Sequence, residues 1–163
     1  SLVINDSLKL LYATIPVTVE IMSPVDRGPI FINADTIQLQ QVFINLCTNA
    51  VHSMNERGLL KINLEVVEPA TQELPASIDQ LVSQYAKLSV ADTGSGMTKE
   101  TVDKIFDPFF TTKAVGVGTG MGLSVVHGIV EQHGGFITVH STLGQGTTFN
   151  IYFPTIRTFH EQS

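Results

Sequence analysis

The residues best suited to chemistry are a carboxylate followed by two glycines, in the stretch Asp92-Thr93-Gly94-Ser95-Gly96-Met97. The apolar run 88–91 precedes them, so the carboxylate stands where a strand ends. Glycines let the backbone pass close to a flat or anionic ligand, and the stretch therefore predicts one wall of a nucleotide pocket. Alone, such a turn is equally typical of an ordinary strand-to-helix connection, in which Gly supplies a positive φ and Asp a local turn.

A second candidate site is a pair of asparagines on a predicted helix. Apolar residues recur at helical spacing between residues 39 and 54, and Asp35 or Thr36 starts the pattern. Asn45 and Asn49 are four residues apart, so they share one face of this helix beside the apolar stripe. Because Asn is a poor helix former, the pair indicates either a ligand site or an ordinary solvated face.

A third stretch joins aromatic residues to glycines. The loop 106–113 contains three phenylalanines, and four alternating glycines at 116–122 lead from it into an amphipathic helix that stops at Gly134-Gly135. Alternating glycines cannot hold one conformation cheaply. We therefore expect a mobile lid over about residues 107–119, hinged on the glycines and anchored by the phenylalanines.

The composition limits the kinds of partner. A chain of 163 residues, 43% hydrophobic and with a net charge of −6, suits one compact domain with a substantial core. The acidic balance and the lack of a Lys/Arg cluster argue against nucleic acid and anionic membrane surfaces. The single Cys47 lies in an apolar pattern, which excludes an internal disulfide and predicts a reduced, cytosolic setting. The chain opens on Ser1, so we expect a piece of a longer protein, whose remainder is soluble or membrane-anchored.

The elements that must position these residues predict an α+β fold. Strands are expected at 17–22, 60–67, 85–91, 136–141 and 147–153, with 30–32 as a hairpin partner of the first. Helices are expected at about 1–12, from 35 to 54, at 99–105 behind a Thr98 cap, and after Gly122. Helices should cover one face of a mixed, mainly antiparallel sheet. The polar segment 68–84 suggests no function.

Five motifs, in order, resemble the N, G1, F, G2 and G3 boxes of the sensor histidine kinase catalytic domain. They lie at 45–50, 92–97, 105–113, 118–123 and 144–149. The resemblance implies the Bergerat-type ATP fold shared by gyrase, Hsp90, histidine kinases and MutL, a two-layer α/β sandwich. It also implies a lead-in from a missing dimerisation domain at 1–16, a catalytic and ATP-binding domain at 17–154, and a C-terminal linker at 155–163.

The resemblance implies ATP and Mg²⁺ as ligands and gives roles to single residues. Asp92 would accept a hydrogen bond from the adenine amino group, supported through water by Thr147 or, as we prefer, Thr148. Asn49 and Asn45 would hold Mg²⁺ through side-chain oxygens, which suit a hard cation already balanced by triphosphate charge. The remaining residues assigned to the nucleotide pocket are Gly94, Gly96, Phe110, Gly118, Gly120, Gly122 and Leu123.

Two basic side chains are candidates for the phosphates. Lys113 is the nearest fixed cation for the β or γ phosphate, with a solvated loop lysine as the alternative. His52 stands three residues after the second Asn, where many relatives carry Lys or Arg, and it is either a phosphate contact or a surface histidine. His133, in the last turn of its helix, is explained by the negative end of the helix dipole.

The reaction implied is transfer of the γ-phosphoryl group of ATP to a histidine. ATPases of the superfamily carry a Glu four residues before the metal-binding Asn to activate water, and Asn45 occupies that place here, so hydrolysis should be poor. No histidine of the chain lies in the acceptor motif. The implied partners are a helical dimerisation and phosphoacceptor domain, with a response regulator or a fused receiver domain downstream. The piece itself should be a monomeric kinase domain in the cytoplasm that binds no nucleic acid.

Three alternatives remain at the level of sequence. The first is a nucleotide-binding docking module without transfer activity. The second is an anti-sigma-type serine kinase, which often has a histidine at the His52 place but typically lacks the Phe-rich box and has an acidic residue at the Asn45 place. The third is a superfamily ATPase that works as a conformational clamp, which Asn45 and the short lid disfavour.

Overall fold

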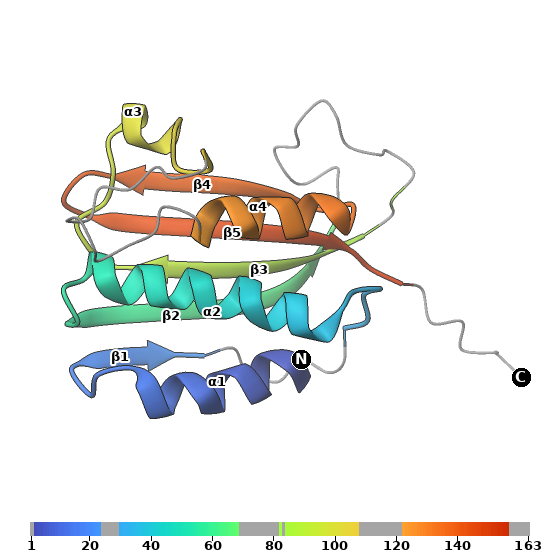
Figure 1. The fold of residues 1–163 in the computed structure, drawn as a ribbon, viewed down its shortest axis with the longest axis horizontal. Coiled ribbons are helices and arrows are strands. Elements are labelled where there is room, and N and C mark those ends of the chain that lie inside the picture. Colours follow the sequence, from blue (N-terminus) through green and yellow to red (C-terminus); the bar gives the residue numbers. More distant parts are fainter. Residues whose placement is uncertain (1, 24–29, 69–81, 83, 108–121, 157–163) are drawn as a thin grey trace, which may run out of the picture.

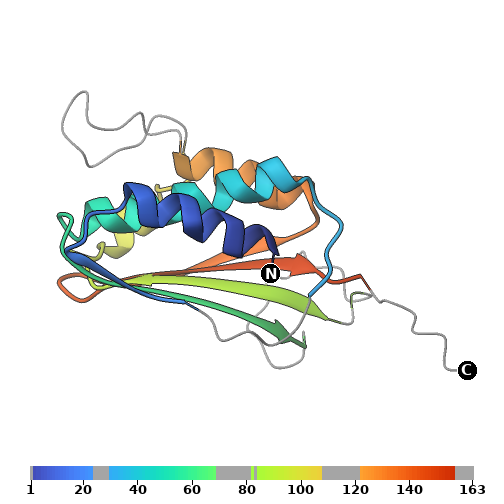
Figure 2. The same ribbon diagram turned by 90° about the horizontal axis from the view of Figure 1, so that it is seen from below.

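The computed structural model describes residues 2–23, 30–68, 82, 84–107 and 122–156. Helices α1 (Leu2–Thr14), α2 (Thr36–Ser53) and α4 (Gly122–Gln132) lie on one face of a sheet, as Figures 1 and 2 show from two directions. A fourth, short helix α3 (Lys99–Val102) follows the third strand. The expected two-layer α+β architecture is therefore confirmed. None of the described helices combines the length and the apolar character needed to cross a membrane.

The sheet is mixed and mainly antiparallel, as predicted. Its strands are β1 (Val19–Met22), β2 (Gly58–Val67), β3 (Tyr85–Asp92), β4 (Phe136–Thr142) and β5 (Gly146–Pro154), in the spatial order β1-β2-β3-β5-β4 among the described residues. Only the β1–β2 pair in this part of the chain is parallel. Because β3 and β5 are central, residues at their ends are held by neighbouring strands on both sides.

The expected hairpin between 17–22 and 30–32 is wrong. β1 pairs in parallel with β2, with Val19 opposite Gly58, and α2 forms the crossover that a parallel pair requires. Ile32 instead forms an isolated bridge with Thr155, just beyond β5. The sequence at 23–29 predicts a turn after β1, but it does not indicate which strand lies beside β1.

The main core lies between the helices and the sheet. α2 buries Val42, Phe43, Leu46, Cys47, Ala50 and Val51, and these side chains pack with alternate residues of the central strands, Leu88, Val90, Phe149 and Ile151. Burial raises the pKa of the Cys47 thiol to about 12, so the thiol stays protonated and unreactive. A smaller cluster on the opposite face contains Val67, Tyr85 and Tyr152.

Capping fixes where α2 starts and where α3 starts. The Asp35 side chain accepts a hydrogen bond from the Gln38 backbone N–H at 3.0 Å, and the Thr98 hydroxyl accepts one from the Thr101 N–H at 3.2 Å. The Thr98 cap is as predicted, and α2 starts at one of the two positions expected for it, although α3 ends three residues earlier than expected. After α2, Asn55 has a positive φ and the chain turns directly into β2. The C-terminal end of α2 is thereby held beside the C-terminal end of β3.

Candidate functional site

The described residues of the predicted site come from the C-terminal half of α2, the loop after β3, and the starts of α4 and β5; α2 and β3 both end on the left in Figure 1. α4 runs antiparallel to α2 (Figure 1), and the first residue of α4, Gly122, lies beside Asn45 in the middle of α2. The side-chain amide of Asn45 contacts the Gly122 carbonyl oxygen there, at a long hydrogen-bond distance of 3.5 Å. This contact brings the first and fourth sequence motifs together, although the two residues are 77 positions apart along the chain.

Asp92 is buried, with 9% of its surface exposed. Its Oδ1 atom accepts hydrogen bonds from the Gly94 N–H at 2.8 Å and from the Ser53 hydroxyl at 3.1 Å, and the Thr147 backbone N–H also donates to the carboxylate. Burial raises the pKa of Asp92, while the three donors act in the opposite direction. The carboxylate is therefore held in a fixed position by groups from α2, from its own loop and from β5.

The glycines of the Asp92 loop are needed for packing inside the protein. A Cβ atom at Gly94 would lie 2.3 Å from the Ser53 Oγ and 2.6 Å from the Ser53 backbone oxygen. Gly96 has a φ of +67°, and a Cβ there would lie 2.0 Å from the Thr142 oxygen. These two glycines let the loop lie directly against α2 and the β4–β5 turn.

The two threonines of the fifth motif lie on opposite faces of the sheet. Thr148 is paired with Ala91 in the β3–β5 register, so its side chain is on the face away from the helix-side core residues Val90 and Phe149. Thr147 is on the same face as Asp92, is 5% exposed, and has its hydroxyl 2.8 Å from the Ser141 hydroxyl. The geometry thus favours Thr147 over Thr148 as the neighbour of Asp92.

A polar row runs along one side of α2. Asn45, Asn49 and Ser53 are spaced four residues apart, and each is partly buried, while His52 is exposed. The first two were predicted as site residues. Ser53 was not predicted as a site residue. It could have been, because it continues the four-residue spacing that identified Asn45 and Asn49.

The rest of the predicted site lies partly outside the described residues. Phe110, Lys113, Gly118 and Gly120, and nearly all of the predicted lid, belong to the stretch 108–121 that the structure leaves out. Gly122 opens α4, and Leu123 is partly buried against the main core. Two residues before position 108, the ring centroid of Phe106 lies 5.2 Å from the ring centroid of His127 on α4.

The donor set at this end suits a cation that arrives with anionic oxygens. In the described part of the chain, no group of three or more His, Cys, Asp and Glu side chains is placed to hold a metal ion. Among the described residues, Asn45 and Asn49 contribute neutral amide oxygens to this side of α2. Neutral oxygen donors fit a hard cation such as Mg²⁺ when phosphate groups supply the negative charge.

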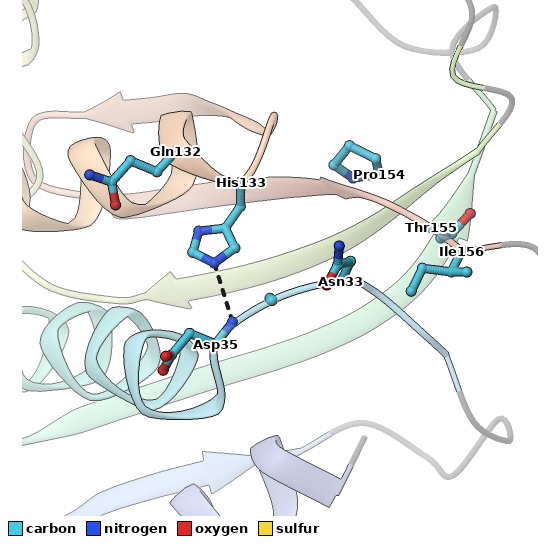
Figure 3. A pocket seen from close by; sticks show the side chains of 8 residues that line it. Asn33, Asp35, Gln132, His133, Pro154, Thr155 and Ile156 are labelled. Carbon is cyan, nitrogen blue, oxygen red and sulfur yellow. Dashed lines mark hydrogen bonds between the residues drawn. The ribbon is translucent and has the colours of Figure 1, made fainter.

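A pocket of about 520 Å³ lies at the opposite end of the sheet and contains none of the predicted site residues (Figure 3). His133 lines it: its Nε2 atom accepts a hydrogen bond from the Asp35 backbone N–H at 3.3 Å, and its Nδ1 atom lies 2.7 Å from the Ile129 carbonyl oxygen. The ring thus contacts a carbonyl of the last turn of α4, in line with the expected helix-end role. This pocket joins the start of α2 to the end of α4.

Comparison with known proteins identifies relatives of the chain. Residues 34–157 match the family described as histidine kinase-, DNA gyrase B- and HSP90-like ATPases. The chain is 43% identical over 123 residues to the sensor kinase CckA of Brucella abortus strain 2308, and this alignment covers 76% of the chain but 13% of CckA. The chain therefore spans only a small part of that relative's length.

Solved structures show the same fold. The catalytic domain of histidine kinase ThkA is 30% identical with a TM-score of 0.72, covering 93% of this chain and 90% of that domain. Full-length ShkA, solved in complex with AMPPNP, is 25% identical with a TM-score of 0.73, covering 96% of this chain and 30% of ShkA. Since the family match spans most of the chain and ThkA's catalytic domain matches it almost end to end, this chain belongs to the histidine kinase-, DNA gyrase B- and HSP90-like ATPase family, as a sensor histidine kinase catalytic domain.

Proposed function

We propose that this domain binds Mg-ATP and transfers the γ-phosphoryl group to a histidine on a separate helical dimerisation and phosphoacceptor domain. The observation that carries the proposal is the buried Asp92 carboxylate, fixed by N–H and O–H donors at the end of the helix that carries Asn45 and Asn49. A fixed carboxylate accepts a hydrogen bond from the amino group of adenine and repels the oxygen that guanine has at the same place. ShkA, which was solved with AMPPNP, supports an adenine nucleotide as the ligand.

The phosphates belong at the other end of the polar row. Gly122 begins α4, an 11-residue helix whose N-terminal N–H groups and positive dipole end favour phosphate oxygens. Asn45 contacts the Gly122 carbonyl oxygen, and this contact supports a metal ion on α2 beside phosphates at the start of α4. Mg²⁺, when bound, would neutralise charge that develops on the transferring phosphoryl group. Within the left-out stretch, Lys113, Gly118 and Gly120 complete this proposal, with Phe110 beside the nucleotide.

The residues present favour transfer over hydrolysis. A water molecule must lose a proton as it attacks, but the Asn45 amide has no basic atom to accept that proton. A neutral imidazole attacks through the lone pair of its ring nitrogen, so the first step needs no base from this domain. We therefore expect slow hydrolysis and much faster transfer to a correctly placed histidine.

The wider setting follows from the same reaction. A phosphohistidine on the acceptor domain would pass its phosphoryl group to a response regulator or a fused receiver domain. Since ATP is available inside the cell, the domain would work in the cytoplasm, whether the whole protein is soluble or anchored in a membrane. This domain alone would be a monomer.

Calorimetric titration with a non-hydrolysable ATP analogue, with and without Mg²⁺, tests the binding step. We expect micromolar to sub-millimolar affinity that Mg²⁺ strengthens. In Asp92→Asn, the amide must present its NH₂ group either to the Gly94 N–H or to the adenine amino group, so affinity should fall at least about tenfold. Unchanged affinity in this variant would contradict the proposed base contact.

A radiolabel transfer assay tests the chemical step. The domain and γ-labelled ATP are incubated with the phosphoacceptor domain of the intact kinase, and acid-labile label on that domain is the expected product. Nucleotide binding without transfer, under conditions in which the intact kinase labels itself, would favour a docking module. Label on serine would favour an anti-sigma-type kinase.

A further inference from the structure

We propose that Ser53 is a positioning residue for adenine recognition: its hydroxyl holds Oδ1 of Asp92, so that Oδ2 faces the amino group of the base. This inference rests on the proposed function, because it concerns how the same site recognises its nucleotide. Ser53 belongs to none of the five sequence motifs. It is the last residue of α2.

The hydroxyl hydrogen of Ser53 has two acceptors within reach. The Oγ atom lies 3.0 Å from the Ala50 carbonyl oxygen and 3.1 Å from Asp92 Oδ1. The Ala50 oxygen already accepts the backbone N–H of Met54 at 3.2 Å. A carboxylate oxygen is the stronger acceptor, because hydrogen bonds to ionised groups are roughly twice as strong as neutral ones. The hydrogen is therefore assigned to Asp92.

Two donors together saturate Oδ1. The Gly94 N–H at 2.8 Å and the Ser53 hydroxyl at 3.1 Å both point to this one oxygen, and a carboxylate oxygen has about two lone-pair directions. The final side-chain torsion of Asp is broad, so an Asp without such restraints would rotate. With Oδ1 fixed from two sides, the direction of Oδ2 is fixed as well.

Ser53 contacts the Asp92 loop through its main chain as well as its side chain. Its carbonyl oxygen accepts the Ser95 N–H at 3.1 Å, and Gly94 packs so closely on it that no Cβ fits between them. Removing only the hydroxyl leaves the main-chain bond in place. Ser53→Ala therefore tests the side-chain contact without separating α2 from the loop.

The experiment compares two nucleotides that differ only in the group that Asp92 is proposed to recognise. ADP and 6-H purine riboside diphosphate, which lacks the amino group, are titrated calorimetrically into the wild type, Ser53→Ala and Ser53→Thr. We expect the wild type to prefer ADP. Ser53→Ala should bind ADP about five- to tenfold more weakly, with unchanged affinity for the purine analogue. Ser53→Thr keeps a hydroxyl and should restore the preference.

Each other outcome overturns a stated claim. If Ser53→Ala still prefers ADP as strongly as the wild type does, Ser53 does not position the carboxylate that contacts the base. The same conclusion follows if Ser53→Ala loses affinity equally for ADP and for the purine analogue. Loss of the preference in Ser53→Thr would lead to the same conclusion, even if Ser53→Ala did not fold. Failure of the wild type itself to bind ADP, or to prefer it over the analogue, would instead overturn the proposed adenine recognition.

Discussion

Single residues of the site differ in how strongly their surroundings constrain them. Asp92 is fixed by donors from three segments, whereas Asn45 makes one long hydrogen bond among the described residues. A constrained carboxylate recognises one arrangement of donors, and a less constrained amide adjusts to the coordination sphere of an ion. We therefore expect base selectivity to depend on Asp92 and metal dependence to depend on the asparagines.

The pH dependence of stability follows from the burial of Asp92. Its pKa in the folded state is raised by desolvation, so between the ordinary value of about 3.9 and the raised value the folded state binds more protons than the unfolded state. Stability should then increase as the pH falls through this window, and it should decrease as the pH rises through the raised pKa. The asparagine of Asp92→Asn does not titrate in this pH window, so the variant lacks this contribution to the pH dependence.

Urea unfolding of wild type and Asp92→Asn between pH 7 and pH 3.5 measures this effect. We expect the stability of the wild type relative to the variant to increase towards acid, because other titrating groups are common to both proteins. A difference independent of pH would show that Asp92 has the same pKa in both states.

Asn49→Ala should remove the effect of Mg²⁺ on nucleotide binding. We expect an affinity loss of at least about tenfold with Mg²⁺, comparable to the loss of a supporting group at a metal site, and little change without it. Thr48→Ala is the matched control, because Thr48 is the exposed neighbour on the same helix. Calorimetric titration with and without Mg²⁺ gives both values, and equal losses in both conditions would contradict a metal role.

At the scale of elements, the contact between α2 and the Asp92 loop should limit substitution at one glycine. Gly94→Ala would place a Cβ 2.6 Å from the Ser53 backbone oxygen, which cannot move away as a side chain does, so we expect a loss of about 1–3 kcal/mol. At Gly128, in the middle of α4, an added Cβ would have no atom within 4 Å apart from its chain neighbours and the nearby backbone of its own helix. Gly128→Ala should therefore stabilise the protein by about 0.5–1 kcal/mol.

Urea unfolding with both variants checks these opposite signs. Equal effects of the two substitutions would mean that the fit of the loop against α2 does not constrain residue 94.

Elements with a strong local pattern were predictable from the sequence, and partners across the sheet were not. The spacing of apolar residues, with Asp35 or Thr36 as the expected start, predicted α2 to within a residue at each end. The pairing of β1 with β2 depends on the crossover through α2, which no local pattern near β1 records. Likewise, the sequence placed Thr147 and Thr148 side by side, and only the register against β3 shows which of them shares a face with Asp92.

At the scale of the whole molecule, two cores share the same strands. Tyr85 and Tyr152 belong to the smaller cluster and are 1% and 3% exposed, while their strands β3 and β5 also carry the central residues of the main core. The two cores lie on opposite faces of β3 and β5, so unfolding of these strands would disrupt both cores at once. We therefore expect a single cooperative unfolding transition.

Tyrosine fluorescence and far-ultraviolet circular dichroism test this expectation. The chain has no Trp, so its fluorescence comes from three tyrosines, and the third, Tyr12, is already exposed. Coincident urea midpoints from the two signals are expected. Separate midpoints would mean that the smaller cluster unfolds independently of the helices.

The polar row on α2 also sets a length. From Asn45 to Ser53 the helix advances eight residues, or about 12 Å at 1.5 Å per residue, which is the scale of a nucleotide stretched from base to phosphates. In the proposed complex, the single helix α2 would therefore set the distance between the two binding sites, with the base beside Ser53 and the metal beside Asn45 and Asn49. One inserted residue between Asn49 and Ser53 would turn the two ends about 100° apart, so the spacing along this helix tolerates substitution far better than it tolerates a change in length.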